Sequence, residues 1–162
     1  MEKVEQKYTN RSVTHPVTQD PGITDQHGRS FNYLRIAVNE KCNLRCIYCM
    51  PEKGISFEPQ DKLLTRKEVI RVIQVVAKLG VNKIRFTGGE PLLRKDLVEL
   101  VSGAAETPGI DSINLTTNGI LLANSAKSLK DGGLTGVNVS IDTLEKEKYT
   151  EITRRDLSLI HI

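Results

Sequence analysis

The chain has 162 residues, of which 38% are hydrophobic and 27% charged, with a formal net charge of +3 and no Trp. This length and balance fit one globular domain with its own core. The small charge and the scarcity of aromatic residues argue against a nucleic-acid-binding surface. No stretch approaches the roughly 20 apolar residues that cross a membrane, and the polar start MEKVEQKYTN is not a secretory signal. Three clustered cysteines do not suggest a disulfide framework either, so we expect a cytoplasmic protein.

The first 30 residues carry Pro16, Pro21, Gly22 and Gly28 and show no sustained periodicity. Such a composition does not support a packed core. We predict that residues 1–30 form a mostly flexible leader that becomes ordered near the sequence GRSFNY, and that residues 31–156 form the folded domain.

From Tyr33 onward, short β-rich runs alternate with helical patterns. Strands are predicted at YLRIAV (33–38), NKIRF (82–86), SINLTT (112–117) and GVNVSI (136–141). The connections between them are long enough for right-handed crossovers, so the strands should be parallel. Four strands are too few to close a barrel. The predicted fold class is α/β.

Three helices are predicted between these strands. The first has Thr65 as its N-cap and Glu68 as the capping-box partner, and it ends at Gly80. Its apolar face is predicted to consist of Val69, Val72, Ile73, Val76 and Leu79. The second is predicted from Arg94 to about Ala105, with inward-facing Leu97, Leu100, Val101 and Ala104. The third covers about 121–131 and ends at Gly132–Gly133.

Unusual segments follow each predicted strand. The cysteine-containing loop follows the first strand, TGGEP (87–91) the second, TTNG (116–119) the third, and SIDTL (140–144) closes the fourth. Functional groups of parallel α/β sheets gather at the carboxyl ends of the strands. The four segments are therefore expected to converge on one edge of the sheet.

All three cysteines of the chain lie in CNLRCIYC, at Cys42, Cys46 and Cys49. Thiolates suit zinc, copper(I) or an iron–sulfur cluster. A structural zinc site normally takes four protein ligands, and the other soft candidates, His15, His27 and His161, lie in weakly structured or terminal segments. A [4Fe–4S] cluster on three cysteines leaves one iron open to a small molecule. Structural zinc and inert buried thiols are the alternatives.

The spacing C-x3-C-x2-C, with Tyr48 before the last cysteine and GGEP after the second strand, resembles the radical S-adenosylmethionine superfamily. Within it, the segments YLRIAVNEKCNLRCIYCMPE, LGVNKIRFTGGEPLLRKDL, LTTNGILL, VNVSIDTL and EITRR are similar in order and spacing to the GTP 3′,8-cyclase family. The resemblance runs from about Asp25 to Arg155 and covers only the N-terminal part of that family. Phe86 stands where an aliphatic residue is commoner.

The resemblance implies a [4Fe–4S] cluster on Cys42, Cys46 and Cys49, with S-adenosyl-L-methionine on its open iron. It also implies contacts to S-adenosylmethionine from Tyr48, Gly89 and Ser140. Gly88 joins this set because, like Gly89, it has no side chain, so that its backbone can approach the ammonium group of the methionine. Glu90 joins it because a carboxylate can balance the positive charge of that ammonium group. Alone, GGEP is also compatible with a plain β-turn.

For the substrate, the resemblance implies that Arg35, Arg85 and Thr116 contact GTP. Guanidinium groups bind phosphate oxygens through paired hydrogen bonds, which suits the two arginines. The alternatives are that Arg35 and Arg85 are outward-facing strand residues and that Thr116 and Asn118 only close a strand into a turn.

The implied activity is that of a lyase that converts GTP to 3′,8-cyclo-7,8-dihydro-GTP, the first step of molybdenum cofactor biosynthesis, with an external electron donor. The implied fold is a partial TIM-type barrel with about four of six strands present. The resemblance also allows a homodimer of the full-length protein, and it implies a second [4Fe–4S] cluster on three further cysteines. No cysteine follows Cys49, so we expect this chain to be inactive alone.

The last residues, 157–162 (LSLIHI), resemble translated sequencing-adapter DNA and predict a non-native tail on an N-terminal fragment. The alternative is a genuine short protein with a hydrophobic tail. In a fragment the fourth strand would be an open edge, and the chain is expected to be poorly soluble or partly unfolded. Two other functions stay open: a different radical S-adenosylmethionine enzyme, such as a peptide-modifying maturase, and a non-catalytic iron–sulfur or zinc-binding module.

Overall fold

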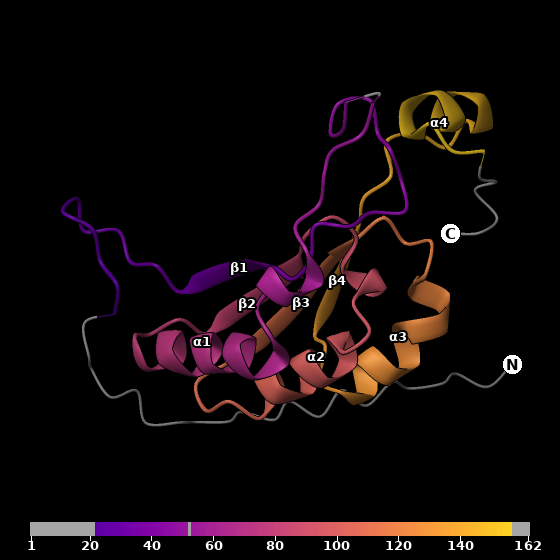
Figure 1. Ribbon diagram of the computed structural model, residues 1–162. Helices are drawn as coiled ribbons and strands as arrows, with labels where there is room; N and C mark the ends of the chain where they lie inside the picture. Colours follow the sequence, from indigo (N-terminus) through magenta and orange to yellow (C-terminus); the bar gives the residue numbers. More distant parts are fainter. Residues whose placement is uncertain (1–21, 52, 157–162) are drawn as a thin grey trace, which may run out of the picture.

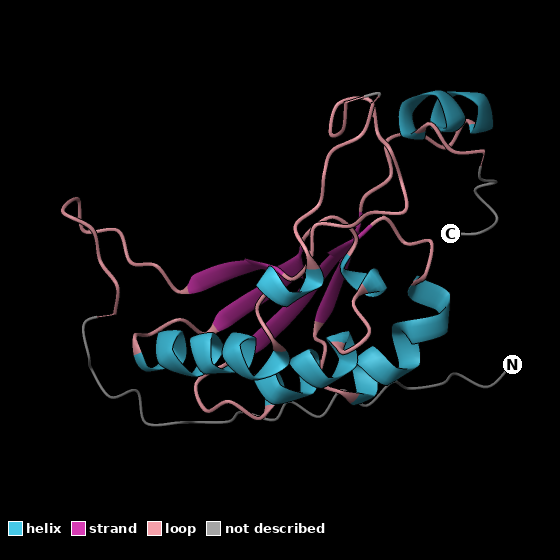
Figure 2. Ribbon diagram, viewed as in Figure 1, coloured by secondary structure: helices cyan, strands magenta, loops and turns pink. Residues whose placement is uncertain are grey.

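The computed structural model describes residues 22–51 and 53–156. Four strands alternate with helices along this part of the chain (Figures 1 and 2). In order, the elements are β1 (Tyr33–Ala37), η1 (Gln60–Lys62), α1 (Arg66–Lys78), β2 (Lys83–Thr87), η2 (Pro91–Leu93), α2 (Leu97–Ala105), β3 (Ser112–Thr117), α3 (Leu122–Asp131), β4 (Gly136–Val139) and α4 (Lys146–Thr153), where η marks a 3-10 helix. The predictions for residues 1–21 and 157–162 lie outside the described residues.

The strands form one sheet in the order β1-β2-β3-β4, and every neighbouring pair is parallel. The predicted α/β class and parallel topology are confirmed. Helices α1, α2 and α3 cover one face of the sheet, whereas the described residues place no helix on the other face (Figure 2). This one-sided arrangement is an open segment of a barrel wall.

The core lies between the sheet and its helix layer. Because side chains alternate along a strand, every second residue points into this core. Ile84, Phe86, Ile113 and Leu115 are buried there against Val69 and Ile73 of α1, Leu97, Leu100, Val101 and Ala104 of α2, and Leu129 of α3. Burial of the four α2 residues confirms the predicted inward face of that helix.

Helix α1 begins as predicted. The Thr65 side chain accepts a hydrogen bond from the Glu68 backbone N–H (3.4 Å), and the Glu68 carboxylate accepts one from the Thr65 N–H (2.7 Å). This reciprocal capping box satisfies two of the N–H groups that a helix leaves unpaired at its start. Gly80, with φ of +90°, follows the C-cap and turns the chain toward β2.

The predicted apolar face of α1 was wrong in part. Val72 and Leu79 are 40% and 48% exposed, whereas Val69 and Ile73 are buried. Each residue advances an α-helix by about 100°, so Val72 points about 100° away from the buried Ile73, whereas Ile70 and Val76 point only about 60° away from it. Ile70, which was not predicted, packs against the core instead.

Two further elements differ from the sequence expectation. Helix α2 begins at Leu97 rather than Arg94, because Pro91–Leu93 form the short η2 and Arg94 ends it in an extended conformation. Helix α4 was not predicted at all. It lies beyond the carboxyl ends of the strands rather than in the helix layer (Figure 1).

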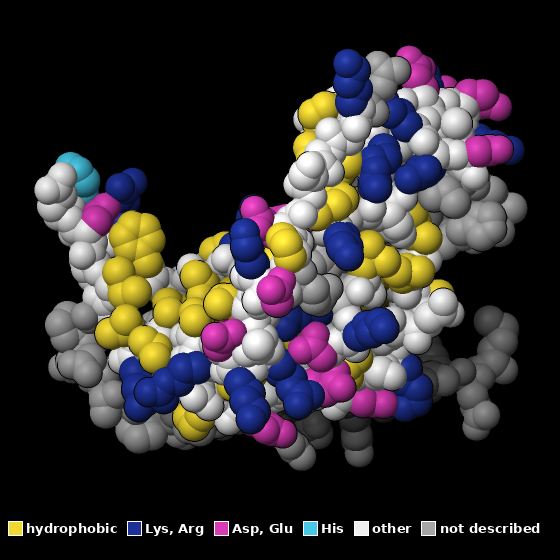
Figure 3. All heavy atoms as spheres, in the orientation of Figure 1, with side chains coloured by type: hydrophobic (Ala, Val, Ile, Leu, Met, Phe, Trp, Pro, Cys, Tyr) yellow, Lys and Arg dark blue, Asp and Glu magenta, His cyan; other side chains and the backbone are white. Residues whose placement is uncertain are grey.

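A hairpin-like loop precedes β1. The carboxylate of Asp25 accepts hydrogen bonds from the backbone N–H groups of His27 and Arg29, and a bridge joins Thr24 to Ser30. Exposed hydrophobic side chains gather where this loop meets the end of α1 (Figure 3), and they include Ile23, Phe31 and Leu79.

Within the described residues, no helix has the length and hydrophobicity required to traverse a bilayer.

Candidate active site

A cavity of about 220 Å³ lies at the carboxyl ends of the strands. It is lined by segments that follow all four strands and by α4. Of the predicted site residues, it contains Cys42, Cys46, Tyr48, Cys49, Gly88, Gly89, Glu90, Thr116 and Ser140. The predicted convergence of the four segments on one edge is therefore observed in the structure.

The cysteine loop folds back on itself around Cys46. The backbone N–H groups of Cys49 and Met50 both donate to the Cys46 carbonyl, at 3.0 and 2.9 Å, and the Leu44 N–H points at the Cys42 sulfur (3.4 Å). The Asn118 side chain donates to Asn43 Oδ1 at 2.7 Å, which ties the loop to the TTNG segment. The loop is thus held from within and from the end of β3.

The three thiols are free and differ in exposure: Cys49 is exposed, and the other two are half-buried. Burial raises the pKa of Cys42 and of Cys46 above that of an ordinary thiol. A protonated thiol is a poor metal ligand. Cys42 and Cys46 therefore become thiolates only when a bound cation compensates for the water that burial removes from around the negative charge.

No three His, Cys, Asp or Glu side chains in residues 22–51 and 53–156 surround a point where one metal ion would fit. A [4Fe–4S] cluster makes a different demand, because each cysteine binds a separate iron atom. Three thiols that line one cavity without converging on a point fit such a cluster. The chemistry of this donor set, all soft sulfur, fits it as well.

Gly88 and Gly89 lie against the backbone that leads into the cysteine loop. A Cβ atom on Gly88 would be 2.4 Å from the Asn39 carbonyl oxygen, and one on Gly89 would be 2.4 Å from that of Lys41. The Gly89 N–H donates to Asn39 O (3.0 Å). The two glycines therefore permit a close contact between the GGEP segment and the chain that leads into the cysteine loop. The sequence analysis explained the glycines only by the approach of a ligand and did not predict this contact.

Glu90 is 1% exposed, and its carboxylate is fully engaged by the protein. It accepts hydrogen bonds from the Thr117 hydroxyl (2.7 Å), the Asn118 N–H (2.8 Å) and the Leu92 N–H (3.0 Å). These donors connect the end of β2 to the end of β3. Glu90 therefore ties the two strand ends together, and its predicted contact with an ammonium group stays a prediction.

Tyr48 connects the cysteine loop to the end of β4. Its hydroxyl donates to Asp142 Oδ2 at 2.9 Å, although most of the ring is exposed. Ser140, two residues before Asp142, also lines the cavity, and its N–H continues the β3–β4 ladder by donating to Thr117 O (2.8 Å). The segment after β4 thus forms part of the cavity wall.

Arg35 and Arg85 do not line the cavity; they lie side by side on the helix-free face of the sheet, paired in register across β1 and β2. Arg85 donates to the Thr116 hydroxyl at 3.1 Å and so reaches toward the cavity wall. Burial acts to raise the pKa of Tyr33, but the neighbouring Arg35 and Arg85 outweigh it and lower that pKa. Their combined positive charge would attract an anion to this face.

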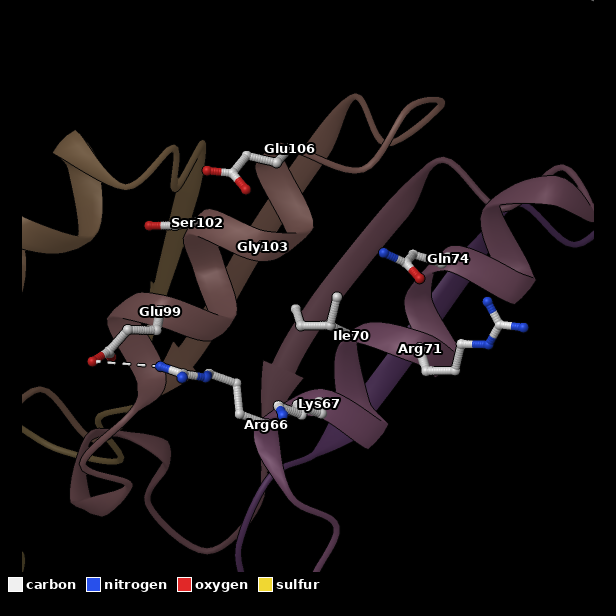
Figure 4. A pocket seen from close by; sticks show the side chains of 9 residues that line it. All are labelled: Arg66, Lys67, Ile70, Arg71, Gln74, Glu99, Ser102, Gly103 and Glu106. Atoms are coloured by element: carbon white, nitrogen blue, oxygen red, sulfur yellow. Dashed lines mark ion pairs between the residues drawn. The ribbon is translucent and has the colours of Figure 1, made fainter.

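A larger cavity, of about 490 Å³, lies between α1 and α2 on the outside of the helix layer (Figure 4). Ile70 projects toward Gly103 in its middle, and Arg66 reaches toward Glu99 at 4.0 Å. It contains none of the cysteines or the segments at the strand ends. We therefore do not place the chemistry of the protein in this larger cavity.

Known proteins similar to this chain point to one enzyme superfamily. Residues 36–159 match the family model of the radical SAM superfamily. The chain is 54% identical over 132 residues to a GTP 3′,8-cyclase of Pelotomaculum thermopropionicum, covering 82% of this chain and 41% of that protein. It is 47% identical over 146 residues to the molybdenum cofactor biosynthesis protein moc-5 of Caenorhabditis elegans, covering 90% and 24%.

The fold is also similar to that of solved structures. A crystal structure of BtrN in complex with AdoMet and 2-DOIA aligns with a TM-score of 0.55 at 23% sequence identity, over 82% of this chain and 54% of that one. The structure of Streptococcus suis SuiB bound to precursor peptide SuiA aligns with a TM-score of 0.56 over 75% and 26%. The match of the family model across most of the chain shows that the chain belongs to the radical SAM superfamily.

Proposed function

We propose that this chain forms the cluster-binding and S-adenosylmethionine-binding part of a GTP 3′,8-cyclase. The observation that carries the proposal is the joint placement of the three cysteines, GGEP, TTNG and the end of β4 around one cavity. Arg35 and Arg85 lie on the adjoining open face of the sheet. The relatives named GTP 3′,8-cyclase support the choice of substrate.

In this proposal Cys42, Cys46 and Cys49 hold a [4Fe–4S] cluster. When bound, the cluster and S-adenosylmethionine supply a radical able to abstract hydrogen from an unreactive carbon. The residues around the cavity contribute position and the exclusion of water. Leu44 and Met50, 5% and 6% exposed, shield the base of the loop from solvent.

For S-adenosylmethionine, we propose contacts from Tyr48, Ser140 and the backbone of Gly88 and Gly89, all of which line the cavity. The Gly89 N–H is already used by the Asn39 carbonyl, so the proposed contacts are made by the backbone carbonyls of the two glycines, which the amino group of the ligand approaches without meeting a side chain. Glu90 acts one step back, because its hydrogen bonds fix the ends of β2 and β3 relative to each other.

For GTP, we propose that Arg35 and Arg85 bind phosphate oxygens and that Thr116 orients Arg85 and contacts the nucleotide. Arg85 already donates to Thr116, which restricts its side chain before the substrate arrives. Preordering of this kind reduces the entropy lost on binding. The product would be 3′,8-cyclo-7,8-dihydro-GTP, formed in a reducing cytoplasm with an external electron donor.

The chain spans 24% to 41% of the length of the curated relatives named above. Its only three cysteines all lie in the loop of the proposed cluster. We therefore propose that it performs the cofactor-binding half of the reaction, and that a second cluster would need cysteines other than these three.

Anaerobic reconstitution of the 162-residue chain tests the cofactor part of the proposal. We expect about four iron atoms per chain and, after reduction, an EPR signal whose shape changes when S-adenosylmethionine is added. A variant with Cys42, Cys46 and Cys49 all replaced by Ala is the control and should bind no iron. Bound zinc without iron, or a cluster indifferent to S-adenosylmethionine, would favour the non-catalytic module instead.

Nucleotide binding to the reconstituted chain separates a cyclase from a peptide-modifying enzyme. Titration with GTP should give heat or a fluorescence change in wild type, and a clearly weaker response when Arg35 and Arg85 are replaced by Ala. Lys127→Ala, which removes an exposed cation of α3, is the control for the loss of a positive charge elsewhere on the surface. Absence of any GTP binding by the loaded protein would count against the substrate assignment.

A further inference from the structure

Helix α4 packs against the cysteine loop instead of against the sheet (Figure 1). Tyr149 and Thr153, on its inner side, are 2% and 1% exposed and line the candidate cavity. Tyr149, Leu44 and Met50 are buried but are not part of the main core. The loop and α4 thus form a small packing unit of their own above the strand ends.

Backbone hydrogen bonds join the end of α4 to the first half of the loop. The Arg45 N–H donates to the Thr153 carbonyl (3.0 Å), and the Ile47 N–H donates to the Ile152 carbonyl (2.9 Å). Both donors lie between Cys42 and Cys49 in the sequence. The carbonyls left unpaired at the C-terminus of α4 are therefore used to hold the cysteine loop.

Two arginines that follow α4 donate hydrogen bonds to the two ends of the cysteine loop. Arg154 donates from Nη1 to the Met50 carbonyl at 3.0 Å, next to Cys49, and Arg155 donates from Nε to the Asn43 carbonyl at 3.3 Å, next to Cys42. The two side chains thereby hold backbone atoms that lie far earlier in the chain, 104 residues before Arg154 and 112 residues before Arg155.

The backbone at Arg154 is unusual. With φ of +52°, it is the only non-glycine residue among those described that has a left-handed conformation. This conformation costs an ordinary residue about 1 kcal/mol or more, and helices usually place Gly at such a position. Arginine here is explained if its guanidinium is needed at the Met50 carbonyl.

We propose that Arg154 is a positioning residue for the cluster: it locks the cysteine loop in its ligating conformation before iron binds. The proposal rests on the proposed function only in taking Cys42, Cys46 and Cys49 as the cluster ligands. Arg155 and the α4 carbonyls contribute to the same clamp. Sequence reasoning singled out EITRR as a family segment, but it gave the two arginines no role.

Thiol alkylation of the metal-free 162-residue chain tests the clamp directly. All cysteines lie in the loop, so their reaction with iodoacetamide reports on that loop alone. A hydrogen bond of ordinary net strength changes an opening equilibrium about five-fold. We therefore expect Arg154→Ala and Arg154→Gly to accelerate alkylation of the half-buried Cys42 and Cys46 about five-fold. Arg154→Lys should stay nearer to wild type because its ammonium also reaches a carbonyl.

Arg154→Gly separates the side chain from the backbone, because Gly adopts the left-handed conformation without strain. If only the backbone turn mattered, Arg154→Gly would react at the wild-type rate, and the proposal would be overturned. Arg71→Ala, on the outer surface of α1, is the matched control and should also react at the wild-type rate. The midpoint of thermal unfolding of Arg154→Gly should stay within about 4 °C of wild type; a much larger fall would mean that Arg154 supports the whole fold.

Reconstituted protein gives a second measurement that a purely structural role would not change. With the clamp released, the loop adopts several conformations, and we expect a broadened EPR signal of the reduced cluster, restored by Arg154→Lys. A sharp, wild-type signal in Arg154→Gly would overturn the proposal. Failure of wild type itself to hold iron would refute the proposed function, whereas the alkylation rates would still decide whether the clamp exists.

Discussion

Replacement of Glu90 by Gln is the sharpest test of how the candidate site is organised. The Glu90 carboxylate is buried and accepts three hydrogen bonds, from the Thr117 hydroxyl and from two backbone N–H groups. Gln has one oxygen and one NH₂ group at these positions. Whichever way the amide turns, its NH₂ group faces at least one backbone N–H, so one buried donor loses its acceptor.

The size of the effect follows from these contacts. A hydrogen bond to a charged group contributes about 1.5–3 kcal/mol, and an unsatisfied buried donor adds a penalty of similar size. Part of this loss is relieved by the remaining amide oxygen, so we expect the free energy of unfolding of Glu90→Gln to fall by about 3 kcal/mol. Glu99→Gln, on the exposed face of α2, removes only a 4.0 Å surface ion pair and should change stability by less than about 0.5 kcal/mol.

Urea unfolding followed by circular dichroism measures both variants, and titration with S-adenosylmethionine after reconstitution measures ligand binding. A Glu90→Gln chain as stable as Glu99→Gln would refute the reasoning from the three hydrogen bonds. If its stability were unchanged while its affinity for S-adenosylmethionine fell more than about ten-fold, Glu90 would be a direct ligand contact, as the sequence first suggested.

Three further outcomes are expected. Gly89→Ala places a Cβ 2.4 Å from the Lys41 carbonyl and should lower both stability, by about 1–3 kcal/mol, and iron content after reconstitution; Gly28→Ala, with open space around it, should leave iron content unchanged. The hydrogen bond from Arg94 lowers the pKa of Asp96 below its ordinary 3.8. Ionised Asp96 therefore contributes its full stabilisation above pH 3.8, and this contribution is lost as the pH falls through the lowered pKa of the folded state. The difference in free energy of unfolding between wild type and Asp96→Asn, measured by urea unfolding, should therefore shrink to zero in acid. Arg85→Ala should weaken GTP binding by about ten-fold or more without loss of iron.

The sequence was sufficient to predict the parallel sheet and the meeting of the four segments that follow its strands at one edge. The four strands and the start of α1 follow from local rules, namely β-branched runs and the capping box at Thr65 and Glu68. Convergence follows from topology, because parallel strands with crossover helices bring all their carboxyl ends to one edge. Neither inference depends on which side chains touch each other.

The predictions that failed depend on packing that a sequence does not encode locally. Val72 has the same residue type as Val69, and only the position of the sheet makes one exposed and the other buried. Helix α4 has weak local signals: its N-cap, Glu145, makes no capping hydrogen bond, and the helix ends at Arg154 rather than at a glycine. Its position is set by contacts with the cysteine loop, about 100 residues earlier for the pair Ile47 and Ile152.

These long-range contacts give the GGEP and EITRR segments a common physical role. The Glu90 N–H donates to the Lys41 carbonyl just before the first cysteine (2.8 Å), and Arg154 donates to Met50 just after the last (3.0 Å). Both ends of the loop are thus fixed by protein groups that do not require a bound metal. A loop held at both ends loses less conformational entropy when it binds a cluster. The affinity of the three cysteines for iron should therefore depend on residues that never touch it.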